Sequence, residues 1–254
     1  MTPVHENRFQ DFFEEGRYVG LKNHLYNYKL RKRAVENVLA RERFDLILEV
    51  GSGISPVMTS TDRIVYSDIS FLACRTLKRL HGKGWYVAAD MTHLPFRADA
   101  FSHAVCSEVI EHIEDDRAAL GEIARVLKAR GRLILTFPHR KAYFANDDRY
   151  VKHYRRYEIE ETDRLLRDAQ LYPLATRNVL GPLEKVTMMF AVLFFENLIK
   201  FADANQFAKP HTTMRLLSPV FKLANLAYAA LLRFEAFVIP QRWAAVLLTT
   251  AEKR

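Results

Sequence analysis

The segment from residue 45 to 55, DLILEVGSGIS, constrains the fold more than any other part of the chain. An apolar run, Leu46 to Val50, ends at Gly51-Ser52-Gly53, and this pattern predicts a buried strand that ends in a tight turn. Glycines at such a turn let the backbone approach a ligand closely, because no Cβ intervenes. The turn predicts a nucleotide-like ligand, since open parallel sheets bind such ligands outside the carboxyl ends of their strands.

Two residues around this turn distinguish between kinds of nucleotide ligand. A dinucleotide-binding fingerprint has a third glycine three residues after Gly53, for close packing of the next helix, and this chain has Pro56 there. Glu49 would repel a diphosphate, and its charge suits a ligand that carries an ammonium or sulfonium group. The segment therefore favours a positively charged ligand over NAD.

Further strand-like segments follow at regular intervals. From residue 40 to 137 they alternate with helical segments, which predicts a parallel sheet with helices on both faces. The later strands are predicted at 64–68, 86–91, 101–108, 131–137, 171–180 and 243–250, and the helices at 21–39, 115–129 (with Gly131 as its C-cap glycine) and 160–170.

The succession of Glu49-x-Gly51-x-Gly53, Asp68 and Asp90 resembles the motifs of class I S-adenosylmethionine-dependent methyltransferases, whose superfamily includes small-molecule methyltransferases, over roughly residues 40 to 180. The resemblance implies an α/β, Rossmann-like doubly wound fold with a seven-stranded, mostly parallel sheet, whose last strand lies antiparallel between the fifth and the sixth. It also implies S-adenosyl-L-methionine as cofactor, with Asp68 on the ribose hydroxyls and Asp90 on the adenine amino group. The cofactor-binding residues that it implies are Glu49, Gly51, Ser52, Gly53, Asp68, Ile69, Asp90, Met91 and Ser107.

The three acids also have a simpler interpretation. Taken one at a time, Asp68 and Asp90 fit strand-ending turn residues, because such positions favour Asp, and Glu49 fits a buried acid with a local partner. Their joint order along the chain favours the cofactor site.

The 254 residues fit a single domain. We divide it into an N-terminal helical cap (1–44), a cofactor-binding core (45–181), an apolar helical insertion before the last strand (182–240) and the last strand itself (241–254). In the cap, a helix with the basic cluster Arg31-Lys32-Arg33 either covers the cofactor site, as the resemblance implies, or presents a solvated basic face.

The insertion contains two helices, about 186–201 and 216–239, that are apolar most of the way round. Four interpretations stay open: a lid on the active site, a dimer interface, a peripheral membrane contact through residues 183–239, or a hairpin packed on itself and the core. Glu196, Lys222 and Glu235 argue against a transmembrane span.

The residues after the fourth strand, Ser107 to Ile113, are predicted to begin a helix with Glu108, Glu111 and His112 on one face. Such a face suits a general base, for which we select His112, or a divalent metal. The Glu-x-x-Glu-His pattern resembles the metal-site motif of the small-RNA 3′-end and quinone-ring O-methyltransferases, but metal-free methyltransferases carry a similar one. We therefore predict no metal; the alternative ligand set is Glu108, Glu111, His112 and His153.

Two more groups are candidates for the acceptor side of the site. His139 follows the fifth strand and is a second catalytic candidate. His153, Tyr154 and Arg155 are candidate substrate residues, because the run His-Tyr-Arg-Arg-Tyr from 153 to 157 could hold an anionic group or stack nucleic-acid bases. The same run also fits a solvated charged face.

Composition limits the function classes without choosing among them. A hydrophobic fraction of 49% excludes a disordered chain, and a net charge of +8 indicates attraction to anionic surfaces. Cys74 and Cys106 lack metal or redox spacing and are predicted to be buried, reduced thiols. With no secretory signal visible, the predicted location is cytoplasmic, with membrane association left open.

Together these features predict methyl transfer from S-adenosyl-L-methionine to a small or lipid-like acceptor, because the insertion offers an apolar wall beside the expected acceptor site. An RNA methyltransferase is the alternative enzyme, supported by the charge and the 153–157 run. A non-catalytic cofactor-binding partner or scaffold protein is the alternative outside enzymes, since a fold does not guarantee activity.

Overall fold

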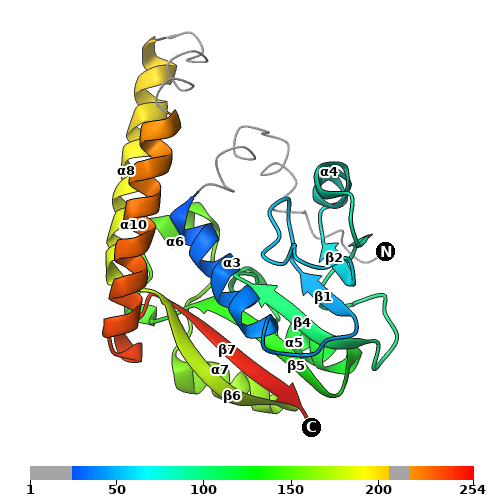
Figure 1. The fold of residues 1–254 in the computed structure, drawn as a ribbon. Helices are drawn as coiled ribbons and strands as arrows, with labels where there is room; N and C mark the ends of the chain where they lie inside the picture. Colours follow the sequence, from blue (N-terminus) through cyan, green and yellow to red (C-terminus); the bar gives the residue numbers. More distant parts are fainter. Residues whose placement is uncertain (1–24, 206–217) are drawn as a thin grey trace.

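The computed structural model describes residues 25–205 and 218–254, which form one seven-stranded sheet flanked by helices (Figure 1). The strands are β1 (Ile47–Val50), β2 (Ile64–Asp68), β3 (Trp85–Ala88), β4 (Phe101–Ser107), β5 (Leu127–Pro138), β6 (Leu171–Leu180) and β7 (Val246–Lys253). Their order is β3-β2-β1-β4-β5-β7-β6, and β7 runs antiparallel to both neighbours while the other pairs are parallel. The predicted fold class is confirmed, including the place of the last strand.

The helices comprise seven α-helices and three short 3₁₀ turns among the described residues. They are α3 (Tyr26–Leu39), α4 (Phe71–His81), η1 (Ile110–His112), α5 (Asp116–Val126), η2 (Lys141–Tyr143), α6 (Asn146–Tyr150), α7 (Ile159–Asp168), α8 (Pro182–Asn205), α10 (Ser218–Val238) and η3 (Gln241–Trp243). The apolar insertion is confirmed as α8 and α10, and it precedes the last strand.

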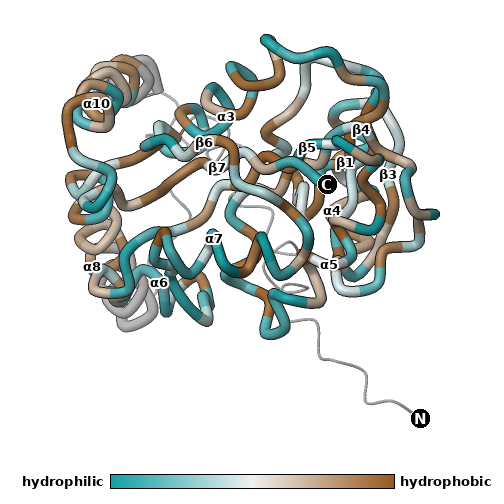
Figure 2. Tube along the Cα trace, turned by 90° about the horizontal axis from the view of Figure 1, so that it is seen from below, coloured by the Kyte–Doolittle hydropathy of each residue, from teal (hydrophilic) through white to brown (hydrophobic). Residues whose placement is uncertain are grey.

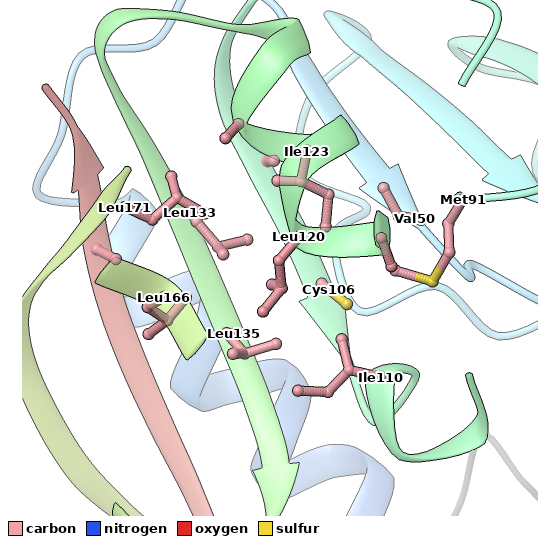
Figure 3. Packing of buried hydrophobic residues seen from close by; sticks show 14 of the residues in the cluster. Val50, Met91, Cys106, Ile110, Leu120, Ile123, Leu133, Leu135, Leu166 and Leu171 are labelled. Carbon is pink, nitrogen blue, oxygen red and sulfur yellow. The ribbon is translucent and has the colours of Figure 1, made fainter. Parts of the chain in front are cut away.

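Two apolar cores hold the helices to the sheet, one on each face. Successive residues of β5 alternate between them, as side chains of a strand must: Leu133 and Leu135 belong to one cluster and Ile134 to the other. Leu120 and Ile123 of α5 pack in the first cluster (Figure 3). That cluster also contains residues of α7, and the second contains residues of α3, α4 and α10.

The two cysteines lie in the interior as predicted. Cys106 is part of the first apolar cluster and Cys74 is a buried residue of α4, and neither forms a disulfide. Burial raises the pKa of Cys74 to about 11, which keeps this thiol protonated at neutral pH.

Several boundaries differ from the prediction. β3 ends at Ala88 instead of 91, and α8 runs from Pro182 to Asn205 instead of about 186 to 201. The helix predicted to end at 129 stops at Val126, because the following residues extend β5, and a positive φ falls on Arg130 instead of Gly131. The last strand begins at Val246 instead of 243, after η3. The helix expected after β4 is one 3₁₀ turn, because Glu108 adopts a φ of 54°, which breaks helical geometry. Residues 21–24 of the first predicted helix lie outside the described residues.

The inner face of the α8–α10 hairpin packs against the rest of the chain, beside α3 and β6. Asn225 Oδ1 accepts a hydrogen bond from the backbone N–H of Tyr26 at 3.1 Å, which caps the start of α3. Asn178 Nδ2 of β6 donates to the carbonyl of Ala236 at 3.0 Å. Within residues 25–205 and 218–254, no helix has the length and apolar character needed to cross a membrane.

Candidate functional site

A cavity of about 750 Å³ lies at the carboxyl ends of β1, β2 and β4, and its volume is typical of small-molecule sites. Tyr28 and Arg31 of α3 line it, as do Glu184 and Met188 of α8. Of the two interpretations of this helix, the structure favours the one in which it covers the site, and Arg31 is an ion-pair partner of Glu108 (Nη1 to Oε2, 3.3 Å) instead of a solvated surface charge. The lining includes every predicted cofactor residue: Glu49, Gly51, Ser52, Gly53, Asp68, Ile69, Asp90, Met91 and Ser107.

The glycine turn after β1 is held open by backbone geometry that glycine alone supplies easily. Gly51 has a φ of 68°, and a Cβ there would lie 2.4 Å from Val109 Cγ2, so a larger residue would be both strained and in collision. Gly53 donates its N–H to Asp68 Oδ2 at 2.8 Å. The turn is thereby tied to the end of β2.

Asp68 is buried, and each of its oxygens accepts one backbone N–H: Oδ2 from Gly53, and Oδ1 from Ser70 at 2.9 Å. Asp68 also lines the cavity, so its carboxylate borders the space that a ligand would occupy. Asp90 is exposed and accepts from the N–H and hydroxyl of Thr92, both at 2.8 Å. Asp90 is thus a turn residue and also a residue of the cavity wall.

Glu49 has the local partners that the simpler interpretation expects. Its carboxylate accepts the backbone N–H of Val57 at 2.7 Å and of Met58 at 3.0 Å. Burial raises the pKa of Glu49 to about 8, although these two hydrogen bonds oppose the rise. Glu49 therefore holds the loop after the glycine turn in place through these hydrogen bonds. With this pKa, both the protonated and the ionised form of its carboxyl group are populated near neutral pH.

On the other part of the cavity wall, three side chains that could ligate a metal or move a proton come together. Possible ligand atoms of Glu111, His112 and His153 all lie within 4.8 Å of one another. The rings of His112 and His153 meet edge to face, with centroids 4.6 Å apart. Glu108, the fourth predicted ligand, is not in this group, because it leaves the helical face at its positive φ and pairs with Arg31.

Asp148 holds His153 in place beside the cavity. Its Oδ1 lies 2.8 Å from His153 Nδ1, while His153 Nε2 lies 3.7 Å from Glu111 Oε1. Glu111 is fully buried behind the cavity wall, and neither of its oxygens has a hydrogen-bond partner in the part of the chain that the structure describes. Burial, with Glu108 nearby, raises the pKa of Glu111 well above its ordinary value.

A buried ion network supports these histidines from below. Lys185 of α8 donates to Asp147 Oδ2 at 2.7 Å and to Asp148 Oδ2 at 2.6 Å, and Arg156 Nε donates to Asp148 Oδ1 at 2.8 Å. Burial alone would raise the pKa of Asp148, but the hydrogen bonds from His153, Arg156 and Lys185 hold it well below its ordinary value. Asp148 is therefore ionised at neutral pH.

Two predicted site residues lie elsewhere. His139 is buried away from the cavity, its Nδ1 lies 2.9 Å from the carbonyl of Tyr157, and burial lowers its pKa. Arg155 does not line the cavity, because it donates to Asp116 at 3.0 Å and to the carbonyl of Glu114. Both residues are structural, whereas His112, His153 and Tyr154 do line the cavity as predicted.

Sequence reasoning missed the residues that build this network. Asp147, Asp148 and Lys185 are each distant from the quoted motifs, and Arg31 was read within a surface cluster. The sequence does hold one signal. A charged pair, Glu184-Lys185, directly precedes the mostly apolar stretch 186–195, and charged residues are almost never fully buried without partners.

The cavity fits a polar nucleoside ligand. Ser52 and Ser55 line it, and their buried hydroxyl oxygens have no hydrogen-bond partner among residues 25–205 and 218–254. Buried hydroxyls without partners are costly, so a ligand that bonds to them is favoured. Together with the carboxylate of Asp68, these hydroxyls give the cavity polar groups that suit the donors and acceptors of S-adenosyl-L-methionine.

Comparison with known proteins agrees with this geometry. Residues 48–135 match the family described as "Methyltransferase domain". An uncharacterized protein of Methanocaldococcus jannaschii is 36% identical over 35% of this chain and 39% of its own length, and the demethylmenaquinone methyltransferase of Paenarthrobacter aurescens is 28% identical over 42% of each. The chain thus spans about two fifths of the curated relatives it matches.

Solved structures share the fold over nearly the whole chain. A possible histamine N-methyltransferase of Thermotoga maritima has a TM-score of 0.63 at 16% identity, covering 97% of this chain and 98% of its own. A Haloferax volcanii protein solved with the Trm112 methyltransferase activator has a TM-score of 0.61 at 15% identity, covering 96% and 97%. Identities this low establish the fold alone.

Proposed function

We propose that this chain, whose residues 48–135 match the methyltransferase domain family, is a class I S-adenosylmethionine-dependent methyltransferase that transfers the methyl group of S-adenosyl-L-methionine to a small or lipid-like acceptor. The observation that carries the proposal is a single cavity lined both by the glycine turn with Asp68 and by His112 with His153. When bound, the cofactor supplies an electrophilic methyl group on a sulfonium sulfur.

The residues that would hold the cofactor are those of the glycine turn and the next two strand ends. Asp68 lines the cavity with a carboxylate, a group that suits ribose hydroxyls, and Gly51 admits a ligand close to the backbone. Asp90 and Met91 line the wall that follows β3, where a polar and an apolar group suit the edge and the face of a base.

The residues of the acceptor side orient the acceptor and take up its proton. His112 lines the cavity beside His153, and Asp148 fixes the tautomer and orientation of His153 through Nδ1. His112 is our candidate general base for an oxygen or nitrogen acceptor. The covering elements α3 and α8 restrict water, and positioning of the acceptor supplies much of the rate in a displacement of this kind.

The acceptor class follows from the wall of the cavity. Met188 of α8, with Val57 and Val151, gives it an apolar part next to the polar histidines. A molecule with an apolar body and one ionisable or hydroxyl group fits this arrangement. The curated relatives named demethylmenaquinone methyltransferases suggest a quinone-like acceptor, and the Thermotoga maritima structure suggests a small amine.

An RNA acceptor has weaker support. Within the run from 153 to 157, Arg155 and Arg156 are engaged with Asp116 and Asp148, and Tyr157 is fully buried. These side chains are thus committed to the fold instead of to stacking or phosphate binding. The other alternative, a role as the partner of another protein, is supported by the structural similarity to the Haloferax volcanii protein that was solved with an activator.

The first experiment is calorimetric titration of the purified protein with S-adenosyl-L-methionine, S-adenosylhomocysteine and NAD, each with and without a chelator. We expect micromolar binding of the two sulfur ligands, no binding of NAD and no effect of the chelator. Absence of binding by both sulfur ligands would contradict the proposed function. Loss of acceptor turnover, but not of cofactor binding, in the chelator would instead assign a metal to Glu111, His112 and His153.

The role of His112 is tested once an acceptor is found. His112→Gln should lower kcat by about 10²- to 10⁴-fold, the usual contribution of a general base, and leave the Kd of S-adenosyl-L-methionine within about twofold. His153→Gln should have the smaller effect and shift the pH profile, because His153 positions its neighbour. An unchanged rate in His112→Gln would remove it from the mechanism.

A further inference from the structure

The outer faces of α8 and α10 expose apolar side chains almost exclusively. Among residues 182–194 of α8 all five exposed side chains are apolar, and among residues 223–238 of α10 nine of ten are, the tenth being Arg233. Phe190 and Phe194 are 68% and 65% exposed, and Phe234 and Phe237 are 65% and 86% exposed. Contiguous apolar surface of this kind marks an interaction site.

The arrangement of the hairpin makes this surface accessible. Figure 1 shows the two helices side by side and extending beyond the end of the sheet, and in the view of Figure 2 apolar colours prevail on α10. The buried positions of α10, Asn225, Ala229, Leu232 and Ala236, follow a spacing of three and four residues, which places them on one side of the helix. The exposed phenylalanines therefore lie on the opposite side.

The sequence of the hairpin indicates which partner covers this face. The insertion as a whole, residues 182–240, contains six Lys or Arg and four Asp or Glu, and its stretch between Asp203 and Glu235 contains four Lys or Arg and no acid, in a chain with a net charge of +8. Apolar helices flanked by basic residues bind at the interface of anionic bilayers. We propose that the outer face of the α8–α10 hairpin docks onto an anionic lipid surface.

A second copy of this chain is a poorer partner for the same face. A two-fold dimer places the same patch of both copies together, and each copy carries a net charge of +8, so that the two copies repel each other. An anionic lipid surface offers the opposite charge and an apolar interior for the phenylalanines.

The docking face adjoins the cavity through α8. Glu184 and Met188 line the cavity, while Phe190 and Phe194 of the same helix are exposed. A lipid-like acceptor in the bilayer would therefore lie close to the apolar wall of the site, a step that rests on the proposed function, whereas docking itself does not.

The test is co-sedimentation of the full chain with vesicles of phosphatidylcholine alone and of phosphatidylcholine with phosphatidylglycerol. We expect binding to the anionic vesicles that weakens at high salt. Phe234→Glu/Phe237→Glu and Phe190→Glu/Phe194→Glu should each lower the partition coefficient at least ~10-fold, because charge replaces buried apolar area. The matched control is Phe71→Glu/Leu80→Glu on α4, whose side chains are 69% and 60% exposed, and it should leave partitioning unchanged.

Folding and the proposed function are followed separately. Thermal unfolding must show that each variant is folded, and retained binding of S-adenosyl-L-methionine shows that the cofactor site is independent of docking. Absence of the full chain from both vesicle pellets, or equal loss of binding in the α4 control, would overturn the proposal. So would a concentration-dependent dimer that the hairpin substitutions dissolve, with no vesicle binding.

Discussion

The two sides of the cavity are built in different ways. On the cofactor side, the contacts join residues close in sequence: Glu49 to Val57 and Met58, and Asp68 to Gly53, at most 15 positions apart. On the acceptor side, Lys185 reaches Asp147 across 38 positions, and Arg31 pairs with Glu108 from another helix. One side is a local motif, and the other is assembled by the tertiary fold.

The two sides of the cavity also differ in the groups that bind their carboxylates. Asp68 and Glu49 accept backbone N–H groups, whereas Asp147 and Asp148 are neutralised by Lys185 and Arg156. Losing one backbone hydrogen bond leaves a modest deficit, but removing one partner of a buried ion pair leaves a charge without compensation. The acceptor side should therefore be the more sensitive of the two to single substitutions.

The strongest test of this contrast is Lys185→Met. It leaves Asp147 and Asp148 buried with fewer cations, so we expect the free energy of unfolding to fall by about 3–5 kcal/mol, measured by urea denaturation. The control Arg117→Met breaks the exposed Arg117–Asp168 pair and should cost under about 1 kcal/mol. Equal effects of the two variants would erase the distinction between a buried network and a surface pair.

The same difference explains what the sequence predicts. Every expected cofactor residue lines the cavity, because the glycine turn and the strand-ending acids are local patterns that fix their own geometry. The acceptor side was predicted only in part: His112, His153 and Tyr154 line the cavity, but His139 and Arg155 do not. Burial and long-range pairing decide where such residues point, and neither can be read from their spacing.

Helix boundaries were also harder to predict from the sequence than the order of the strands. The order of the strands was predictable from alternating apolar runs, yet the expected helix at 107–113 is a single turn. The cause is one backbone angle, the positive φ of Glu108, whose side chain pairs with Arg31 of α3. The Arg31–Glu108 ion pair, between residues far apart in sequence, therefore accompanies the interruption of the helix at Glu108. As a result Glu108, Glu111 and His112 do not share the helical face that was expected.

On the cofactor side, Asp68→Ala should have an intermediate effect. It removes acceptors for a ligand and for the N–H groups of Gly53 and Ser70, so we expect binding of S-adenosyl-L-methionine to weaken by about 1–3 kcal/mol, measured by calorimetry. Asp62→Ala, an exposed residue outside the cavity wall, is the matched control. Unchanged affinity in Asp68→Ala would mean that this acid serves the turn alone and that the two sides are more alike than proposed.

The smallest expected effect concerns Glu49, whose pKa burial raises to about 8. Above its ordinary pKa of about 4.3 the unfolded chain releases this proton while the native state keeps it, so stability falls as pH rises through this window. Between pH 7 and 8 we expect a loss of roughly 1 kcal/mol, measured by urea denaturation at both pH values, that Glu49→Gln reduces. An identical pH dependence in wild type and variant would show that Glu49 is already ionised in the native state, which would return it to the list of groups free to attract a cationic ligand.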